Sequence, residues 1–476
     1  MALDSRLREA LLGLRDLFGF ATMSGGERIG VPRGHCAARL DPESIWHFRT
    51  VRSAIMRFIH LADVHLDTPF SSRSPEVRAR LRTATREAFE AAVGLAIQEG
   101  VHAFLIAGDL FDGDRVSFET EAFVIGALDR LRGAGVQVVY ASGNHDPGTP
   151  GNRAMHMAWP EGMVLVSDPS PRRVEVRDAD GAPVGYVTAA GHASDRESED
   201  LSARFPRPPS DLPEVALLHS QVVGSLDEAA HEPYAPSTLE GLRTAGYDYW
   251  ALGHVHLCQE LAAEPPIWYS GSMQGRTPRE DGVRGCLLVD LSRRDRPSVT
   301  FRGLSPVQWV RLSVDGIEAC RNLGDLVDVV SRAWSSDGQA RAADPARTIL
   351  HLTLAGPCPL WRLLAQREEL DALGEAIVAR LGLLWADAFA PRVHAVVELD
   401  EHTARPDVLG EVLRLVEAVE SGAEPPPTPA DHDLALSYVL GVPDPATYLA
   451  ELLAGGQEDV LARLLQHGES GRGSVG

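Results

Sequence analysis

The sequence predicts an α/β protein in which a two-sheet sandwich flanked by helices is followed by a small α/β domain and C-terminal helices. Three observations predict this class. Strands and long helices alternate after residue 56, a series of closely spaced strands follows, and the periodicity changes near residue 305. With 476 residues the chain is also long for one hydrophobic core, so we expect two or three domains.

The first part of the predicted sandwich alternates strands with helices. Short apolar runs that predict strands span 58–61, 103–107 and 136–141. Helices are expected at 75–98 and 118–132, and Gly133 and Gly135 end the second one. Strand, helix and strand at this spacing predict parallel strands joined by crossover helices.

The next strands are separated by turn residues rather than by long helices. They are expected at 173–176, 184–188, 215–218, 247–252, 267–270, 285–290 and 299–302. Because they follow one another closely, we expect them to form a second sheet packed on the first. The segment 194–211, rich in charge and proline, is typical of a surface loop.

A small α/β domain is predicted after the periodicity changes at Gly303–Val307. Its strands are expected at 309–314, 348–355 and 392–399, and its helices at 323–334 and 360–381. Two amphipathic helices follow, at 406–420 and 446–466, on either side of the proline-rich linker 424–429. We therefore divide the chain into four parts: 1–55, 56–305, 306–400 and 401–476.

Residues 1–55 lack the periodicity of the parts that follow. A short amphipathic helix precedes the Gly/Arg-rich stretch Ser24–Arg39, and Met56 lies directly before the first predicted strand. Two interpretations are open: translation starts at Met56, which we favour, or these residues are a loosely attached extension. Met1–Phe18 carries charges throughout, and no apolar run approaches the ~20 residues of a membrane span. We expect a cytoplasmic protein that does not enter a membrane.

The composition excludes several chemistries. The five cysteines lie far apart without a Cys-x-x-Cys pair, which argues against a disulfide framework and a thiolate zinc site. The chain contains no lysine, and all 45 of its basic residues are arginine. A Walker A loop and a Schiff-base enzyme both need lysine, so any ATP-driven step must belong to another subunit.

The net charge of −22 argues against a nucleic-acid partner, but this charge is unevenly distributed. The segment Glu401–Gly476 holds thirteen acidic residues and four arginines, for a net −9. By contrast, Gly271–Arg311 holds eight arginines and four acidic residues, for a net +4. The charge therefore weakens the case for DNA binding without excluding it.

Five short segments carry side chains that bind metals, and each comes just after a predicted strand. They are Asp63-Val64-His65, Gly108-Asp109, Gly143-Asn144-His145-Asp146, His219 and Gly253-His254-Val255-His256. Carboxylates, a carboxamide and imidazoles together are a ligand set that divalent ions such as manganese accept. Ligands gather at the carboxyl ends of strands in α/β sheets, so we expect one sheet edge to collect the set.

This chemistry also needs a proton donor for the leaving oxygen. His145 is adjacent to the candidate ligand Asn144 and is suited to this role. Either Asp112 or Asp146 could hold the His145 ring in orientation. Two divalent ions that share a carboxylate would activate water and position a phosphoryl group.

The five segments resemble the blocks of the calcineurin-like metallophosphoesterase superfamily. Three longer stretches resemble its DNA repair exonucleases of the SbcD type, and most of all the YhaO-like branch: Phe58–Asp67, Tyr234–His256 and Tyr269–Asp290. The resemblance covers Arg57–Arg311 well, and the part after it resembles that family's capping domain more loosely.

The resemblance implies particular site residues. It assigns one metal ion to Asp63, His65, Asp109 and His256. It assigns a second ion to Asp109, Asn144, His219 and His254, so that Asp109 bridges the two. It also implies that His145 is the catalytic histidine, that the ions are manganese, and that the bonds cleaved are DNA phosphodiesters. Nearby, Arg276 and Arg279 are phosphate-binding candidates, with ordinary surface arginines as the alternative.

The resemblance further implies an ATPase partner with long coiled coils, which agrees with the missing Walker lysine. In such relatives a C-terminal helical pair binds that coiled coil. The corresponding face here would comprise Val408, Leu409, Val412, Leu413 and Val416, unless these residues pack on the protein's own domain. The oligomeric state stays open, and a homodimer is one alternative.

Two other functions are compatible with the sequence. The same metal centre would serve a phosphatase or phosphodiesterase for small molecules, nucleotides or phosphoproteins. A protein of another class, a non-catalytic scaffold that only tethers a partner, would not need all seven candidate ligands.

Overall fold

A computed structural model describes the chain from Ile55 onward, with gaps. The described residues are 55–71, 73–209, 211–226, 232–292, 296–387, 392–394, 396, 402–421, 423–424, 457 and 461. The expectations for 1–54, for most of the proline-rich linker and for most of the helix at 446–466 lie outside these residues.

The first sheet has six strands in the order β12-β11-β1-β2-β3-β4. Their bounds are β1 Met56–Leu61, β2 Ala103–Ala107, β3 Gln137–Ala141, β4 Val164–Val166, β11 Gly285–Leu291 and β12 Ser298–Gly303. Strands β1 to β4 are parallel, as the crossover spacing predicts. The assignment of β11 and β12 to the second sheet was wrong, because β11 pairs antiparallel with β1 and so extends the first sheet.

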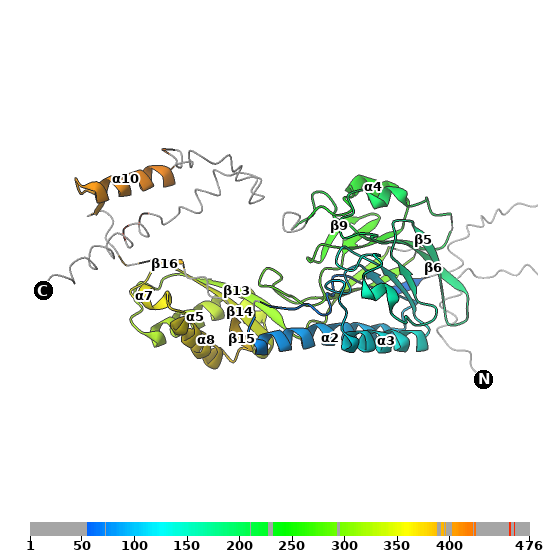
Figure 1. Cartoon of the computed structure of the whole chain (residues 1–476), viewed down its shortest axis with the longest axis horizontal. Coiled ribbons are helices and arrows are strands. Elements are labelled where there is room, and N and C mark those ends of the chain that lie inside the picture. The colour runs from blue at the N-terminus through cyan, green and yellow to red at the C-terminus, as the bar shows by residue number, and fades with distance from the viewer. Residues whose placement is uncertain are drawn as a thin grey trace, which may run out of the picture. The chain divides into compact units, whose positions relative to one another are not determined.

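Two long helices cover the outer face of this sheet, and they lie side by side in Figure 1: α2 Pro75–Gln98 and α3 Phe118–Gly133. Each begins at a serine whose side chain accepts a hydrogen bond from the first turn, Ser74 from the Val77 amide and Ser117 from the Thr120 amide.

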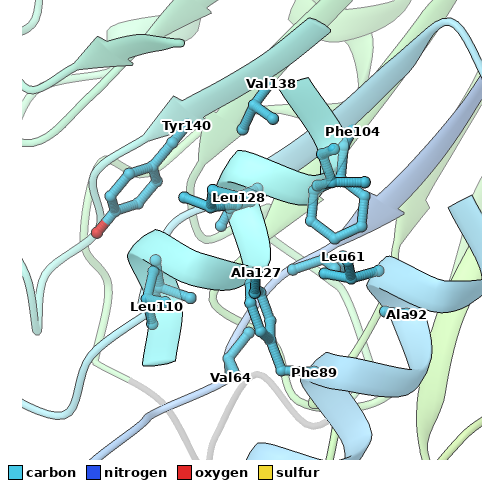
Figure 2. Close-up of a cluster of buried hydrophobic side chains, with 14 of the residues drawn as sticks. Leu61, Val64, Phe89, Ala92, Phe104, Leu110, Ala127, Leu128, Val138 and Tyr140 are labelled. Atoms are coloured by element: carbon cyan, nitrogen blue, oxygen red, sulfur yellow. The ribbon is translucent and has the colours of Figure 1, made fainter. Parts of the chain in front are cut away.

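The core beneath these helices is made by alternate residues of the strands. Figure 2 shows Leu61, Phe104 and Val138 directed toward Phe89 of α2 and Leu128 of α3. The rings of Phe89 and Phe104 meet edge to face with centroids 6.1 Å apart. The other alternate residues of each strand point to the opposite face of the sheet and fill the second core, between the two sheets.

The second sheet also has six strands, in the order β5-β6-β7-β8-β10-β9. Their bounds are β5 Arg172–Arg177, β6 Pro183–Ala190, β7 Glu214–His219, β8 Tyr249–Gly253, β9 Gln259–Ala263 and β10 Pro266–Tyr269. Val187, Val215 and Tyr249 pack against Phe58 and Leu105 of the first sheet. The predicted sandwich flanked by helices is confirmed.

The outer face of the second sheet is covered by a short helix and its neighbouring loops. Trp250 is buried there, and its indole nitrogen donates to the carbonyl of Leu242 in α4 Leu239–Thr244 at 2.9 Å. Within the sandwich, the short elements α4, β4 and β9 were not predicted from the sequence, because three to six residues carry too little periodicity to identify.

A third sheet follows, with the order β13-β14-β15 and β16 paired to β14. Its parts are β13 Gln308–Val314, α5 Leu323–Ser336, α6 Gly338–Ala342, β14 Thr348–Pro357, α7 Trp361–Leu364, α8 Arg367–Leu381, β15 Trp385–Asp387 and β16 Arg392–His394. The predicted single helix at 360–381 is instead two helices, because Gln366 has extended backbone between them (φ −98°, ψ 132°).

The last described helix is α10, Val408–Glu420. It begins two residues later than predicted because the Asp407 side chain accepts a hydrogen bond from the Gly410 amide and so caps it. Val408 is 80% exposed whereas Leu413 is fully buried. These two residues therefore do not share one exposed face. Among the described residues, no helix combines the length and the apolar character that crossing a membrane requires.

Candidate metal centre

The predicted ligands lie together, but at the edges of two sheets rather than one. Asp63, Asp109 and Asn144 follow β1, β2 and β3 of the first sheet, whereas His219 ends β7 and His254 follows β8 of the second. The expectation of a single sheet edge was wrong, because β7 and β8 face β2 across the sandwich. A hydrogen bond links the edges of the two sheets: the Nδ1 atom of His219 lies 2.8 Å from the carbonyl oxygen of Ala107.

Four of the seven predicted ligands have left-handed backbone. The φ angles are 50° at Asp63, 50° at His65, 52° at Asp109 and 103° at His254. Such angles cost roughly 1–3 kcal/mol each outside glycine and concentrate at functional sites. These residues lie at or just beyond the ends of strands β1, β2 and β8.

Two glycines allow the loops to approach closely. A Cβ atom on Gly108, whose φ is 88°, would lie 2.3 Å from Nδ1 of His219. A Cβ atom on Gly143 would lie 2.2 Å from Oδ1 of Asp109. Any side chain at either position would therefore displace a predicted ligand, which explains in physical terms why glycine precedes the aspartate and the asparagine.

The first group of candidate ligands comprises Asp63, His65 and His256, whose ligand atoms lie within 4.8 Å of one another. The Nε2 atoms of His65 and His256 are 3.3 Å apart, and the His256 Nε2 lies 3.8 Å from Oδ1 of Asp63. The Nε2 atom of His65 is also 3.7 Å from Oδ2 of Asp109. Lone pairs that converge in this way suit a shared cation.

The second group gathers around Asp109 and Asn144. The Nε2 atom of His219 lies 3.4 Å from Oδ2 of Asp109 and 3.0 Å from Oδ1 of Asn144. The Nδ1 atom of His254 lies 3.2 Å from the same asparagine oxygen, and its Nε2 lies 2.8 Å from the carbonyl of Glu232. His254 would therefore ligate through Nδ1. Oδ2 of Asp109 also lies 3.7 Å from Nε2 of His65 in the first group, a position that suits a bridging residue.

The electrostatics of these groups fit divalent cations. Burial raises the pKa of the Asp63 carboxyl to about 7, against the lowering effect of His256. Burial alone would also raise the pKa of Asp109, but the facing His219 and His65 rings hold it below its ordinary value. Burial lowers the pKa of both these histidines to about 3, which favours the neutral form that ligation requires. Buried carboxylates beside neutral imidazoles fit a cation.

His145 and Asp112 are adjacent to this centre. The Nδ1 atom of His145 lies 3.1 Å from Oδ1 of Asp112, and the Nδ1 atom of His65 lies at the same distance from the same oxygen. Burial lowers the pKa of His145, but the bond to Asp112 and the charge of Asp109 outweigh it and raise the pKa to about 9. These two carboxylates therefore favour the protonated ring, which could donate a proton.

Asp146 does not orient the His145 ring, which was one of the two alternatives proposed from the sequence. It is fully buried, and its Oδ1 accepts from the Gly143 and Asp109 amides at 2.7 and 3.2 Å. Its Oδ2 accepts from the Phe111 amide at 3.1 Å and from the Tyr140 hydroxyl. Of the two carboxylates considered for His145, only Asp112 bonds to it, and Asp146 instead holds the two loops together.

The two candidate arginines differ. Arg276 forms ion pairs beside the candidate ligands, because its guanidinium lies 3.3 Å from Asp112 and 3.6 Å from Glu280. Its backbone amide also donates a hydrogen bond to Glu280. Arg279 is exposed and has no hydrogen bond or ion pair with any other described residue. Both line a hollow of about 510 Å³ that includes His145 and His254. Arg279 is the freer of the two to meet a phosphate.

Glu280 is a site residue that sequence reasoning missed. It is buried, and its Oε1 lies 3.2 Å from Nδ1 of His256, opposite the nitrogen that faces the other ligands. Its Oε2 accepts from the Ser272 hydroxyl at 3.2 Å. A carboxylate on the far nitrogen fixes the tautomer and orientation of a ligating histidine. No local pattern marks Glu280, because it lies 24 positions from its partner.

We expect Glu280→Gln to lower metal affinity about 10- to 100-fold, because the amide would no longer hold His256 as a charged acceptor does. Titration of the apoprotein with Mn²⁺ measures this effect. Glu260→Gln, at an exposed position of β9, is the matched control and should bind as the wild type does. Unchanged affinity in Glu280→Gln would show that His256 does not need this carboxylate.

Comparison with known proteins identifies the class. Residues 56–258 match the family described as calcineurin-like phosphoesterase. The chain belongs to this metallophosphoesterase family and is a metal-dependent hydrolase, which confirms the resemblance inferred from its motifs. Members use a dimetal site, and the candidate ligands of this chain form groups suited to one.

Three relatives illustrate the similarity. A protein of Bacillus subtilis named uncharacterized metallophosphoesterase YhaO is 33% identical over 68% of this chain and 77% of its own length. The DNA double-strand break repair protein Mre11 of Methanopyrus kandleri is 28% identical over 54% and 58%, respectively. The SbcD subunit of the nuclease SbcCD of Rhodobacter capsulatus is 28% identical over 68% and 86%.

Proposed function

We propose that this protein is a Mn²⁺-dependent DNA phosphodiesterase that acts as an exonuclease in DNA repair, as the nuclease subunit of an ATPase–nuclease complex. The observation that carries the proposal is the convergence of two buried carboxylates, one amide and four imidazoles at the facing edges of two sheets. The names of the Mre11 and SbcCD relatives support DNA as the substrate.

In this proposal seven side chains hold two ions, which supply Lewis-acid activation of water and of the phosphoryl group. One ion would be held by Asp63, His65, Asp109 and His256. The other would be held by Asp109, Asn144, His219 and His254. Neutral histidines and carboxylates are ligands that manganese accepts, and no cysteine lies among them.

The other residues of the site act on the substrate. His145 donates a proton to the leaving oxygen, and Asp112 holds its ring at Nδ1, leaving Nε2 directed away from that carboxylate. Arg276 neutralises Asp112 and Glu280, and Arg279 binds a substrate phosphate. Asp112 holds His65 as well, so one carboxylate positions both a ligand and the acid.

The proposed assembly rests on two features of the chain. Without lysine the chain has no Walker A loop, so ATP would be hydrolysed by a coiled-coil partner. On α10, Val408 and Leu415 are 80% and 50% exposed and offer apolar contacts to such a partner. The third sheet would then belong to the capping domain, residues 306–400, which precedes this helical region in the sequence.

The test is degradation of linear DNA by the purified protein with Mn²⁺, alone and with its partner. We expect nucleotide release that stops when the ion is removed with a chelator and resumes when Mn²⁺ is restored. Hydrolysis of bis(p-nitrophenyl) phosphate without any DNA degradation would favour the small-molecule phosphodiesterase. Absence of metal and of both activities would favour the scaffold.

A further inference from the structure

A second hollow adjoins the metal centre and has no part in the chemistry described so far. It has a volume of about 620 Å³. It shares His256, Arg279 and Glu280 with the hollow over the metal centre. The two hollows therefore adjoin each other at these three residues. We call the second one the side groove and define it by Leu226, Leu257, Arg279, Val283, Phe301 and Arg311.

The side groove is lined by large apolar side chains that are partly exposed to water. Leu257 is 36% exposed, Phe301 40%, Val283 55% and Leu226 66%. A cluster of large apolar side chains on an open surface is characteristic of a binding site. Phe301 presents an aromatic ring to this cluster from β12, at the edge of the first sheet.

The lining of the side groove carries three arginines and two acidic residues, a balance that favours an anionic ligand. Arg279 lies where the two hollows join, and it has no ion pair among the described residues. Arg311 borders the groove farther on, where Asp281 holds its guanidinium at 2.8 Å. A phosphate that left the metal centre along this path would meet Arg279 first.

The loop that joins β10 to β11 lines both hollows, and hydrogen bonds to Trp309 hold it in position. The Gly282 amide donates to the carbonyl of Trp309 at 2.9 Å, and the Trp309 indole donates to the carbonyl of Gly275 at 3.0 Å. Trp309 is fully buried. Because the loop is anchored at both ends, the groove is formed before any ligand arrives, which lowers the entropic cost of binding.

We propose that the side groove receives the unpaired nucleotide next to the scissile phosphate. This inference rests on the proposed function and specifies its substrate as a strand whose end is single-stranded. Arg279 binds the neighbouring phosphate, while Phe301 and Leu257 contact the face of its base. Aromatic contact with a base tolerates any sequence, as an exonuclease requires. A phosphodiester without a second nucleotide does not extend into the groove.

The experiment compares two substrates with Phe301→Ala loaded with Mn²⁺. We expect kcat/KM for a single-stranded oligonucleotide to fall roughly tenfold, the size typical of a lost base contact. Hydrolysis of bis(p-nitrophenyl) phosphate, which reports on the metal centre alone, should stay within about twofold of wild type. Phe118→Ala removes an exposed ring that lines neither hollow and is the matched control, expected to change neither rate.

Each outcome bears on the inference. An equal fall for both substrates would show that Phe301 supports the centre rather than a nucleotide, and no fall for either would show that the groove is unused. Both results overturn the inference while DNA cleavage by the wild type still supports the nuclease. If the wild type fails to cleave the oligonucleotide, the proposed function and the inference fall together.

Discussion

Asp109→Asn is expected to abolish binding of both metal ions and to reduce turnover by roughly 10³-fold or more. The carboxylate lies in the second group of candidate ligands and beside the first, because its Oδ2 faces His219 and His65 at 3.4 and 3.7 Å. An amide has the same shape but carries no charge and only one oxygen. Lewis-acid activation contributes several kcal/mol, and about 4 kcal/mol corresponds to a factor of 10³.

Metal analysis of the purified variant, together with its rate of hydrolysis, checks this expectation. Asp290→Asn is the control, because Asp290 pairs with Arg57 and lies outside both groups of candidate ligands. Retention of both ions in Asp109→Asn would refute the bridging role. Loss of only one ion would show that Asp109 binds that ion alone and does not bridge the two.

His145→Asn should retain both metal ions yet lose about 10² to 10⁴ of its turnover of DNA, the contribution typical of general acid catalysis. His145 lies beside the ligand groups, and its amide donates to Oδ1 of Asp109 at 2.9 Å, a bond that asparagine can also make. The substitution removes the proton donor while the backbone contact that holds the loop remains.

The leaving group distinguishes this role from a structural one. Nitrophenolate leaves without a proton, so hydrolysis of bis(p-nitrophenyl) phosphate should fall much less in His145→Asn than hydrolysis of DNA. His156→Asn, on the exposed ring of another histidine, should leave both rates unchanged. Loss of metal with partial activity, or an equal fall for the two substrates, would contradict the assignment of His145 as the acid.

The sequence was most informative where a pattern was both local and long. The helices at 75–98 and 118–132 and the parallel strands between them follow from hydrophobic periodicity and are confirmed. The antiparallel β11 was misplaced because nothing local determines which sheet a strand joins. That choice depends on pairing with β1, more than two hundred residues earlier in the chain.

The same distinction applies to the site. The segments around Asp63, Asp109 and Asn144 could be found because each comes directly after a strand. Glu280 could not, because its role depends on the fold bringing the loop after β10 back to His256. Whether the seven predicted side chains are the ligands stays a prediction that metal analysis will test.

The placement of the candidate ligands at two facing sheets has a mechanical consequence. Ions shared by loops of both sheets would fasten the two halves of the sandwich, as a cross-link does. An ion that binds only the folded chain, at a free concentration 100 times its dissociation constant, stabilises that chain by about 2.7 kcal/mol. The concentration of free metal would then affect the stability of the folded protein as well as its rate of hydrolysis.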